Sequence, residues 1–257
     1  MLPEFQTLVE IIARLRGPNG CPWDKEQTQK SLTPYIIEEA YELVEAIEGG
    51  SQSEIRDELG DFVFQFVLQA QVAADEGHFS VVDVLRGLNE KMIRRHPHVF
   101  GSEGGQNIEE VWKNWLKIKK EEKGAGDRAL FNYPLTLPAL QVAHKIGRKT
   151  QTYKFDWTSV KQVLAKVHEE LAETEEAVTS AVKADIEHEI GDLLFTVAQL
   201  ARHVGVDPET SLRETNRRFV RRFTEVLKLS GKSVEEFSEM SDSVKEALWL
   251  QAKKNTD

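Results

Sequence analysis

Acidic side chains at helical spacing are the residues of this sequence whose type and position best predict chemistry. Glu38, Glu42 and Glu45 lie three or four positions apart, so on a helix they share one face. Between Thr33 and Glu54 the sequence has no Lys or Arg that could neutralise them, which disfavours a merely solvated face. Carboxylate oxygens are hard ligands that suit Mg²⁺, Mn²⁺ or Ca²⁺ better than zinc or copper. The spacing therefore predicts a divalent-cation site.

The acidic pattern occurs twice. Each glutamate of residues 38–46 has a glutamate counterpart 131 positions further on, in residues 169–177. A second motif, Glu-x-x-Asp at residues 58–61, recurs with the same offset at residues 189–192. The general likeness of amphipathic helices does not explain two separate motifs in one register. We therefore expect an internal repeat in which two helices of each copy aim their carboxylates into one cleft.

Basic and aromatic side chains follow the acidic motifs in both halves. The first half has Lys91, Arg94 and Arg95, and later Trp115 with Lys119 one turn away. The matching residues of the second half are Arg218, Arg221, Arg222, Trp249 and Lys253. Arg and Lys bind phosphate oxygens, and a Trp face can stack on a base. Each of these residues alone fits a solvated helix end or a packing role, but their recurrence in one order favours a nucleotide ligand.

The elements that position these residues are expected to be helices. Helical periodicity recurs along nearly the whole chain and alternating segments are scarce, so the predicted fold class is all-α. Two tandem helical-bundle repeats are expected at residues 1–123 and 138–257, joined by a glycine-rich linker at 124–137. The helices of the second repeat are expected near residues 138–151, 159–181, 184–204, 208–229 and 243–254.

Capping residues set the expected helix limits. Thr33 before Pro34 predicts one N-cap, and Ser53 is expected to open the next long helix. Segments 21–24 and 96–98, each with a proline, are expected to be loops. Further helix starts are predicted at the pairs Ser80 with Asp83, Asn107 with Glu110, and Asp207 with Pro208.

The composition excludes several classes of protein. The net charge of −10 weighs against binding the phosphate backbone of nucleic acids through Lys and Arg. No apolar run approaches the roughly 20 residues of a membrane span, and the N-terminal segment does not resemble a secretory signal. We therefore expect a cytoplasmic protein without a nucleic-acid or membrane partner. The single cysteine, Cys21, excludes an internal disulfide.

Taken together, these motifs resemble the MazG family of all-α nucleoside triphosphate pyrophosphohydrolases. The likeness extends over nearly the whole chain and includes the loop Gly20–Asp24, the segment Arg94–Phe100 and the run Asn216–Phe223. It implies hydrolysis of NTPs and dNTPs to the monophosphate and pyrophosphate, with broad base tolerance and removal of noncanonical nucleotides. One departure is that Asp185–His188 precede the second Glu-x-x-Asp motif, where family members can carry a lysine.

The resemblance also implies roles for the repeated residues. Mg²⁺, with Mn²⁺ as a substitute, would be bound by Glu39, Glu42, Glu58 and Asp61 in the first repeat and by Glu170, Glu173, Glu189 and Asp192 in the second. The basic residues and tryptophans given above would bind the nucleotide. A remaining glutamate, Glu38 or Glu169, would accept a proton from the attacking water. A homodimer is the expected assembly, because two-fold dimers are the commonest closed oligomers.

Two other classes of function fit parts of the pattern. A di-iron carboxylate bundle also places glutamates inside four helices, but it normally needs Glu-x-x-His, and no histidine here follows a glutamate at that spacing. A helical scaffold that only binds other proteins would not require the repeated basic and aromatic residues. Which repeat is active stays open, because both carry a full set of charged residues.

Overall fold

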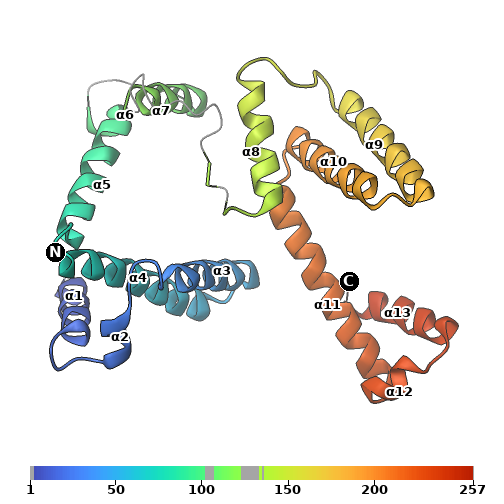
Figure 1. The fold of residues 1–257 in the computed structure, drawn as a ribbon, viewed down its shortest axis with the longest axis horizontal. Coiled ribbons are helices and arrows are strands. Elements are labelled where there is room, and N and C mark those ends of the chain that lie inside the picture. The colour runs from blue at the N-terminus through green and yellow to red at the C-terminus, as the bar shows by residue number, and fades with distance from the viewer. Residues whose placement is uncertain (1–2, 102–106, 123–132, 135, 257) are drawn as a thin grey trace. The chain divides into compact units, whose positions relative to one another are not determined.

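The chain forms two compact units in a computed structural model. The residues described are 3–101, 107–122, 133–134 and 136–256. In these ranges every regular element is a helix, which confirms the all-α prediction. The units are Met1–Gly126 and Asp127–Asp257 (Figure 1). Most of the linker expected at 124–137 lies outside the described residues.

The first unit is centred on a pair of helices that carries both of its acidic motifs. Its helices are α1 (Pro3–Arg16), α2 (Pro22–Glu26), α3 (Thr33–Gly49), α4 (Gln52–Asp75), α5 (Val81–Arg95), α6 (Pro97–Phe100) and α7 (Ile108–Glu122). α3 packs along α4 after a tight turn, and α1 packs against α4 and α2. α5 leaves the end of α4 and packs against α6 and α7 (Figure 1). The packing of α3 on α4 decides where the carboxylates of this unit meet.

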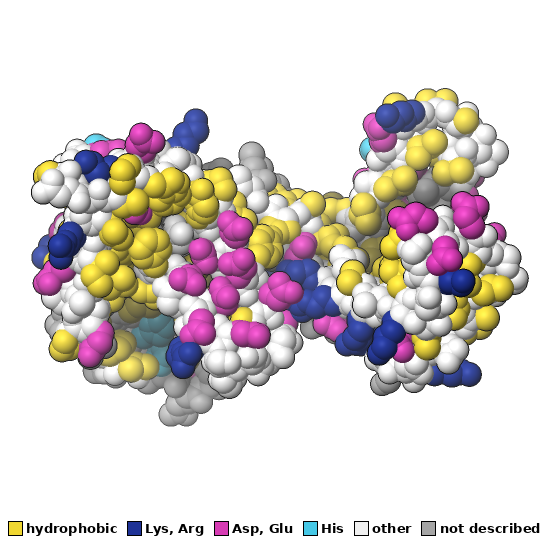
Figure 2. Space-filling view, turned by 90° about the horizontal axis from the view of Figure 1, so that it is seen from below, with side chains coloured by type: hydrophobic (Ala, Val, Ile, Leu, Met, Phe, Trp, Pro, Cys, Tyr) yellow, Lys and Arg dark blue, Asp and Glu magenta, His cyan; other side chains and the backbone are white. Residues whose placement is uncertain are grey.

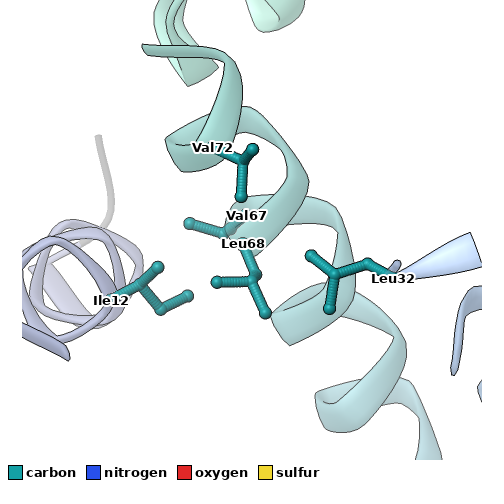
Figure 3. Packing of buried hydrophobic residues seen from close by; sticks show 5 residues of the cluster. All are labelled: Ile12, Leu32, Val67, Leu68 and Val72. Atoms are coloured by element: carbon teal, nitrogen blue, oxygen red, sulfur yellow. The ribbon is translucent and has the colours of Figure 1, made fainter. Parts of the chain in front are cut away.

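The core of the first unit lies where α1 meets α4. Ile12, Leu32, Val67, Leu68 and Val72 are at most 1% exposed and form one cluster (Figure 3). Burial of each such side chain contributes about 1.5–3 kcal/mol to stability. The three α4 members lie in the second half of that helix, so the core anchors this half. The acidic motif of α4 lies in the first half, where it faces α3 and solvent.

The second unit repeats the central helix pair. Its helices are α8 (Ala139–Gln151), α9 (Val160–Ser180), α10 (Lys183–His203), α11 (Pro208–Ser230), α12 (Val234–Ser238) and α13 (Asp242–Thr256). α9 packs along α10 as α3 does along α4, and α8 packs against α10 and α11. α13 packs against α11, where Val226 and Ala252 are buried. None of the helices in the described parts of the chain has the length and apolarity to span a membrane.

Two predicted helix caps are wrong by two residues or fewer. α4 begins after Ser51, whose Oγ accepts the Glu54 N–H at 3.4 Å, so Ser51 rather than Ser53 is the N-cap. Thr33 is already the first residue of α3, and its hydroxyl donates backwards to the Gln29 carbonyl at 3.4 Å. Neighbouring hydroxyls compete for the free N–H groups of a first turn, so spacing alone does not choose between them.

Two segments expected to be loops are short helices. Pro22 opens α2 and Pro97 opens α6, because a proline lacks the N–H that a first turn leaves unpaired and has a suitable φ. The same residue type therefore starts a helix here instead of only ending one. The caps expected at Ser80, Asn107 and Asp207 are confirmed, since each side chain accepts the N–H three residues further on.

Candidate active site

Three carboxylates of the first unit converge between α3 and α4. Glu39 lies on α3, and Glu58 and Asp61 lie one turn apart on α4. One carboxylate oxygen of each residue lies within 4.8 Å of the other two. Burial raises the pKa of Glu39, and the negative charges of Asp61 and Glu42 raise it further. The site therefore concentrates negative charge that only a cation or protons can neutralise.

An equivalent cluster lies between α9 and α10 of the second unit. Glu170, Glu173 and Glu189 each bring one carboxylate oxygen within 4.8 Å of the others. Glu170 is 5% exposed, and Lys166 Nζ lies 2.8 Å from its Oε1. Burial raises the pKa of Glu173 and the neighbouring glutamates add to this, although Lys166 opposes them. This cluster thus already contains one protein cation.

Each cluster contains three of the four carboxylates that the resemblance implies. Glu42 is exposed and lies outside the group of three. The pKa of Glu58 is raised mainly by burial and next by the charge of Glu42. Asp192 lies outside the second group, with its Oδ2 3.4 Å from His188 Nε2. The two glutamates expected to accept a proton also differ, because Glu38 is exposed on α3 whereas Glu169 accepts a hydrogen bond from Lys166 at 2.7 Å.

The basic residues of the first unit gather on α5 and α7. Arg94 Nε donates to Glu122 Oε1 at 2.7 Å and Arg95 Nε donates to Glu122 Oε2 at 3.0 Å. The guanidinium of Arg95 lies 5.5 Å from the ring centre of Trp115. Lys91 is half-buried on α5, and the side chain of Lys119 lies outside the described residues. The structure thus brings these arginines to Glu122 and Trp115, and the carboxylate cluster is assembled on other helices.

The corresponding residues of the second unit gather on α11 and α13. Lys253 Nζ lies 5.6 Å from the ring centre of Trp249, whose ring is 5.2 Å from that of Phe219. Arg218 donates to the Thr215 hydroxyl at 3.2 Å. The two other arginines of this set on α11, Arg221 exposed and Arg222 half-buried, follow one turn later. Aromatic and basic side chains are therefore adjacent here, as in the first unit.

Lys166 pairs with the second cluster but was not among the predicted site residues, because its spacing indicated only local pairing with the glutamates. It lies three and four positions before Glu169 and Glu170, so the helical spacing itself placed it beside them. The hydrogen bonds that it donates to Glu169 and Glu170 raise its pKa above the usual range and hold it as a cation. The spacing resembles ordinary surface pairing, so it did not single out Lys166, whose side chain is half-buried beside the buried Glu170.

Exposed hydrophobic side chains lie on the two helices that carry the first cluster. Ile37 and Tyr41 of α3 and Leu59 and Phe62 of α4 are each 38% to 47% exposed. Figure 2 shows acidic and hydrophobic side chains next to one another on one face of the first unit, at the left of the view. Exposed apolar side chains on helices that also carry a charged cluster are typical of a surface that binds another molecule.

The matched segments of known protein families cover both clusters. A family model for the MazG nucleotide pyrophosphohydrolase domain matches residues 27–100, and one for phosphoribosyl-ATP pyrophosphohydrolase matches residues 141–219. A Thermotoga maritima protein named nucleoside triphosphate pyrophosphohydrolase/pyrophosphatase MazG is 42% identical over 251 residues, which cover 97% of this chain and 95% of that protein. The chain belongs to the MazG family.

Two further relatives align along nearly the full length of this chain. An Escherichia coli K12 protein named nucleoside triphosphate pyrophosphohydrolase is 41% identical over 256 residues, covering 98% of this chain and 97% of that protein. A Bacillus subtilis protein, YabN, is 43% identical over 252 residues, which make up 52% of its own length. The resemblance to MazG drawn from the motifs is therefore confirmed, and it includes both carboxylate-bearing helix pairs.

Proposed function

We propose that this chain hydrolyses nucleoside triphosphates and deoxynucleoside triphosphates to the monophosphate and pyrophosphate, using Mg²⁺ or its substitute Mn²⁺. The observation that carries the proposal is the convergence of three carboxylates within 4.8 Å in each unit of a MazG-family chain. Pyrophosphohydrolase activity follows from the family. Broad base tolerance and removal of noncanonical nucleotides are further parts of the proposal, supported by the resemblance.

The donor atoms fit a hard divalent cation. All the converging groups are carboxylates, and they are crowded enough for burial and like charge to raise the pKa of Glu39, Glu58 and Glu173. Glu39, Glu42, Glu58 and Asp61 would hold the ion in the first unit, and Glu170, Glu173, Glu189 and Asp192 in the second. Bound Mg²⁺ would neutralise triphosphate charge and lower the pKa of a coordinated water.

The protein's own carboxylates then handle the proton of the attacking water. A water oxygen forms a bond to the α-phosphorus while the bond from that phosphorus to the bridging oxygen breaks, which releases pyrophosphate. Glu38 or Glu169 accepts the proton that the water loses. Lys166 holds Glu169 at 2.7 Å and so fixes where this carboxylate stands. Arginine and lysine side chains of the basic sets would hold the phosphates.

Pyrophosphate release from a panel of NTPs and dNTPs in Mg²⁺ tests the proposal. Turnover is expected with several bases and is expected to stop when a chelator removes the metal. In ¹⁸O-labelled water the label should enter the monophosphate, and label found only in pyrophosphate would refute attack at the α-phosphorus. No turnover with any nucleotide would contradict the enzyme proposal and favour a helical scaffold that only binds other proteins.

Matched single substitutions separate the two centres. Glu42 and Glu173 occupy the same register and are both exposed, so Glu42→Gln and Glu173→Gln should leave the fold intact. If Glu173→Gln alone removes all turnover, the first cluster is structural or regulatory. If each variant keeps part of the activity and the double variant keeps none, both centres act.

We also propose that the protein is a homodimer in the cytoplasm. The exposed apolar side chains beside the first cluster favour a second copy as their cover, because an interface of this kind buries apolar area. Sedimentation equilibrium should give twice the chain mass, and Leu59→Glu should reduce it to one. Ile108→Glu, on α7, is the control and should leave the mass unchanged. A wild-type protein with the mass of one chain would contradict the dimer.

A further inference from the structure

A buried glutamine lies next to the carboxylate cluster of the first unit. Gln65 follows Asp61 by four positions on α4, and Asp61 follows Glu58 by three, so the three side chains share one face of that helix. Gln65 is 6% exposed, and the core residues Val67 and Leu68 follow directly on the same helix (Figure 3). The amide of Gln65 is thus shielded from solvent where the acidic half of α4 meets the core half.

The two polar atoms of the Gln65 amide differ in their partners. Burial and the charges of Asp61 and Glu42 raise the pKa of Glu39, and a hydrogen bond from the Gln65 amide opposes them. An ionised carboxylate only accepts hydrogen bonds, so the amide nitrogen is the atom that donates to Glu39. The amide oxygen, Oε1, is buried and accepts no hydrogen bond from the described residues. The nitrogen therefore fixes Glu39, while the oxygen can still accept.

A buried acceptor without a partner points to a ligand that donates. Nearly all buried polar atoms of side chains have a hydrogen-bond partner, because leaving one unpaired destabilises a fold. The amide that carries Oε1 contacts Glu39, a member of a cluster whose donor atoms fit a hard divalent cation. Protein-bound Mg²⁺ usually keeps several of its waters, and a water can donate where a carboxylate cannot. A hydrated cation at the cluster would therefore supply the donor that Oε1 lacks.

The second unit fixes the matching glutamate with a different group. Glu170 has the register of Glu39, 131 positions later, and Lys166 Nζ lies 2.8 Å from its Oε1. The register of Gln65 belongs there to Thr196, which is 3% exposed and has a shorter side chain. A neutral amide thus holds the glutamate of the first unit, and a cation holds that of the second. The amide fixes Glu39 without cancelling its charge, which stays available to a metal ion.

We propose that Gln65 is a positioning residue of the first metal centre. Its amide nitrogen holds Glu39 towards Glu58 and Asp61, and its Oε1 accepts a hydrogen bond from a water that hydrates the cation. Groups that orient metal ligands without binding the metal themselves are needed for full metal affinity. This inference rests on the proposed function, because it requires a divalent cation at the carboxylates. It adds to the centre an uncharged side chain that the acidic motifs do not include.

Mn²⁺ binding to the full-length protein tests this role. Electron spin resonance distinguishes free from bound Mn²⁺, and a Glu173→Gln background removes one carboxylate from the second cluster. In this background Gln65→Met, which keeps the length of the side chain without its polar atoms, should weaken Mn²⁺ binding about tenfold to hundredfold. Gln71→Met is the control, because Gln71 is an amide of the same helix that donates to Asp75 at 2.7 Å, and it should leave the affinity unchanged.

Thermal unfolding separates a role at the metal from a role in folding alone. A purely structural role would lower Tm of Gln65→Met equally in chelator and in Mg²⁺. A positioning role instead reduces the rise in Tm that Mg²⁺ produces, because a ligand stabilises the fold in relation to its affinity. Gln71→Met should keep the full rise. An equal rise in Gln65→Met and in the unsubstituted protein would contradict the positioning role.

The outcomes distinguish this inference from the proposed function. If Gln65→Met binds Mn²⁺ as tightly as its background does, Gln65 has no role at the metal, and the proposed function stands. If the wild-type protein binds no Mn²⁺, the metal centre of the proposed function fails and this inference fails with it. Circular dichroism checks folding, and if Gln65→Met does not fold, Gln65→Leu replaces it with the same expected loss of affinity.

Discussion

Arg202 holds Asp156 through two parallel hydrogen bonds, from Nη1 to Oδ2 at 2.9 Å and from Nη2 to Oδ1 at 2.6 Å. Both side chains are buried, with 6% and 9% of their surface exposed. Burial raises the pKa of Asp156, but hydrogen bonds and charges from Arg202 and His203 outweigh it, so the pKa lies below its usual value. The pair joins the loop before α9 to the end of α10.

Removing this pair should destabilise the second unit. Asp156→Asn leaves the Arg202 charge buried without a counter-charge, so the free energy of unfolding should fall by about 3–5 kcal/mol in denaturant titrations. Asp57→Asn is the control, because the Arg56–Asp57 side chains are 76% and 62% exposed and should contribute at most about 1 kcal/mol. Equal effects of the two substitutions would contradict the buried ion pair.

The Asp156–Arg202 pair also predicts how the stability of the fold changes at acid pH. A folded-state pKa below the ordinary 3.8 means that the charged form of Asp156 contributes stability above pH 3.8 and loses it as the pH falls through the lowered pKa. Wild-type stability should therefore decline in that acid window. Asp156→Asn, which cannot titrate, should show a smaller decline, and an equal decline in both proteins would count against the pair.

The ends of α3 and α9 predict opposite effects of exchanging glycine and alanine. Gly50 and Ala181 occupy the same register and both adopt the left-handed conformation, with φ of +79° and +58°. A Cβ in this region costs about 1–2 kcal/mol, so Ala181→Gly should raise the free energy of unfolding by up to about 1 kcal/mol. Gly50→Ala should lower it by a similar amount. Destabilisation by both changes would show that the strain at Ala181 is absent.

We expect Mg²⁺ to reverse the order of stability of the wild type and a Glu39 variant. Burial and the charges of Asp61 and Glu42 raise the folded-state pKa of Glu39 above 4.5, so its protonation stabilises the fold below that value and the benefit is lost as the pH rises. At neutral pH in chelator, Glu39→Gln should raise Tm by about 1–3 °C. In Mg²⁺ the wild type should gain more and become the more stable protein.

A glutamate outside the cluster provides the control for this reversal. Glu45 lies exposed on the same helix, so Glu45→Gln should change Tm equally in chelator and in Mg²⁺. If Mg²⁺ raises Tm of Glu39→Gln as much as that of the wild type, Glu39 is not a metal ligand.

Glu122 predicts a competition with phosphate for the arginines of α5. Hydrogen bonds from Arg95 and Arg94 lower its pKa to about 2, so it stays charged at every pH above that range. Glu122→Gln should raise the affinity of the first unit for inorganic triphosphate roughly threefold, because it removes the carboxylate that both arginines bind. Calorimetric titration in a Glu173→Gln background measures this, and Arg94→Gln should have the opposite effect. Unchanged affinity in Glu122→Gln would contradict the competition.

Periodicity made the helices predictable, because a helix depends on residues close in sequence, and the recurrence of whole motifs made the repeat predictable. Periodicity also placed Glu58 and Asp61 on one face, and the packing of α3 on α4 then brought Glu39 to them. The basic residues were predictable as groups, but the carboxylate that binds the arginines of the first unit was not. Glu122 lies far along the chain from Arg95, and only the packing of α5 against α7 joins them.

A cavity of about 790 Å³ in the second unit had no signal in the sequence. Its lining comes from three helices and a loop, and it depends on the close approach of α8 to α10 at Gly147, where a Cβ would lie 1.8 Å from Gln199 Oε1. A glycine within a helical pattern does not show which side chains of another helix pack against it.

Tyr35 and Lys166 occupy the same register in the two units, yet Tyr35 packs against the hydrophobic core whereas Lys166 pairs with a buried carboxylate. We therefore expect a substitution at residue 35 to reduce the amount of folded protein. A substitution at residue 166 is expected to change the charge of the second cluster and to leave most of the fold intact. One register thus reports on stability in the first unit and on electrostatics in the second.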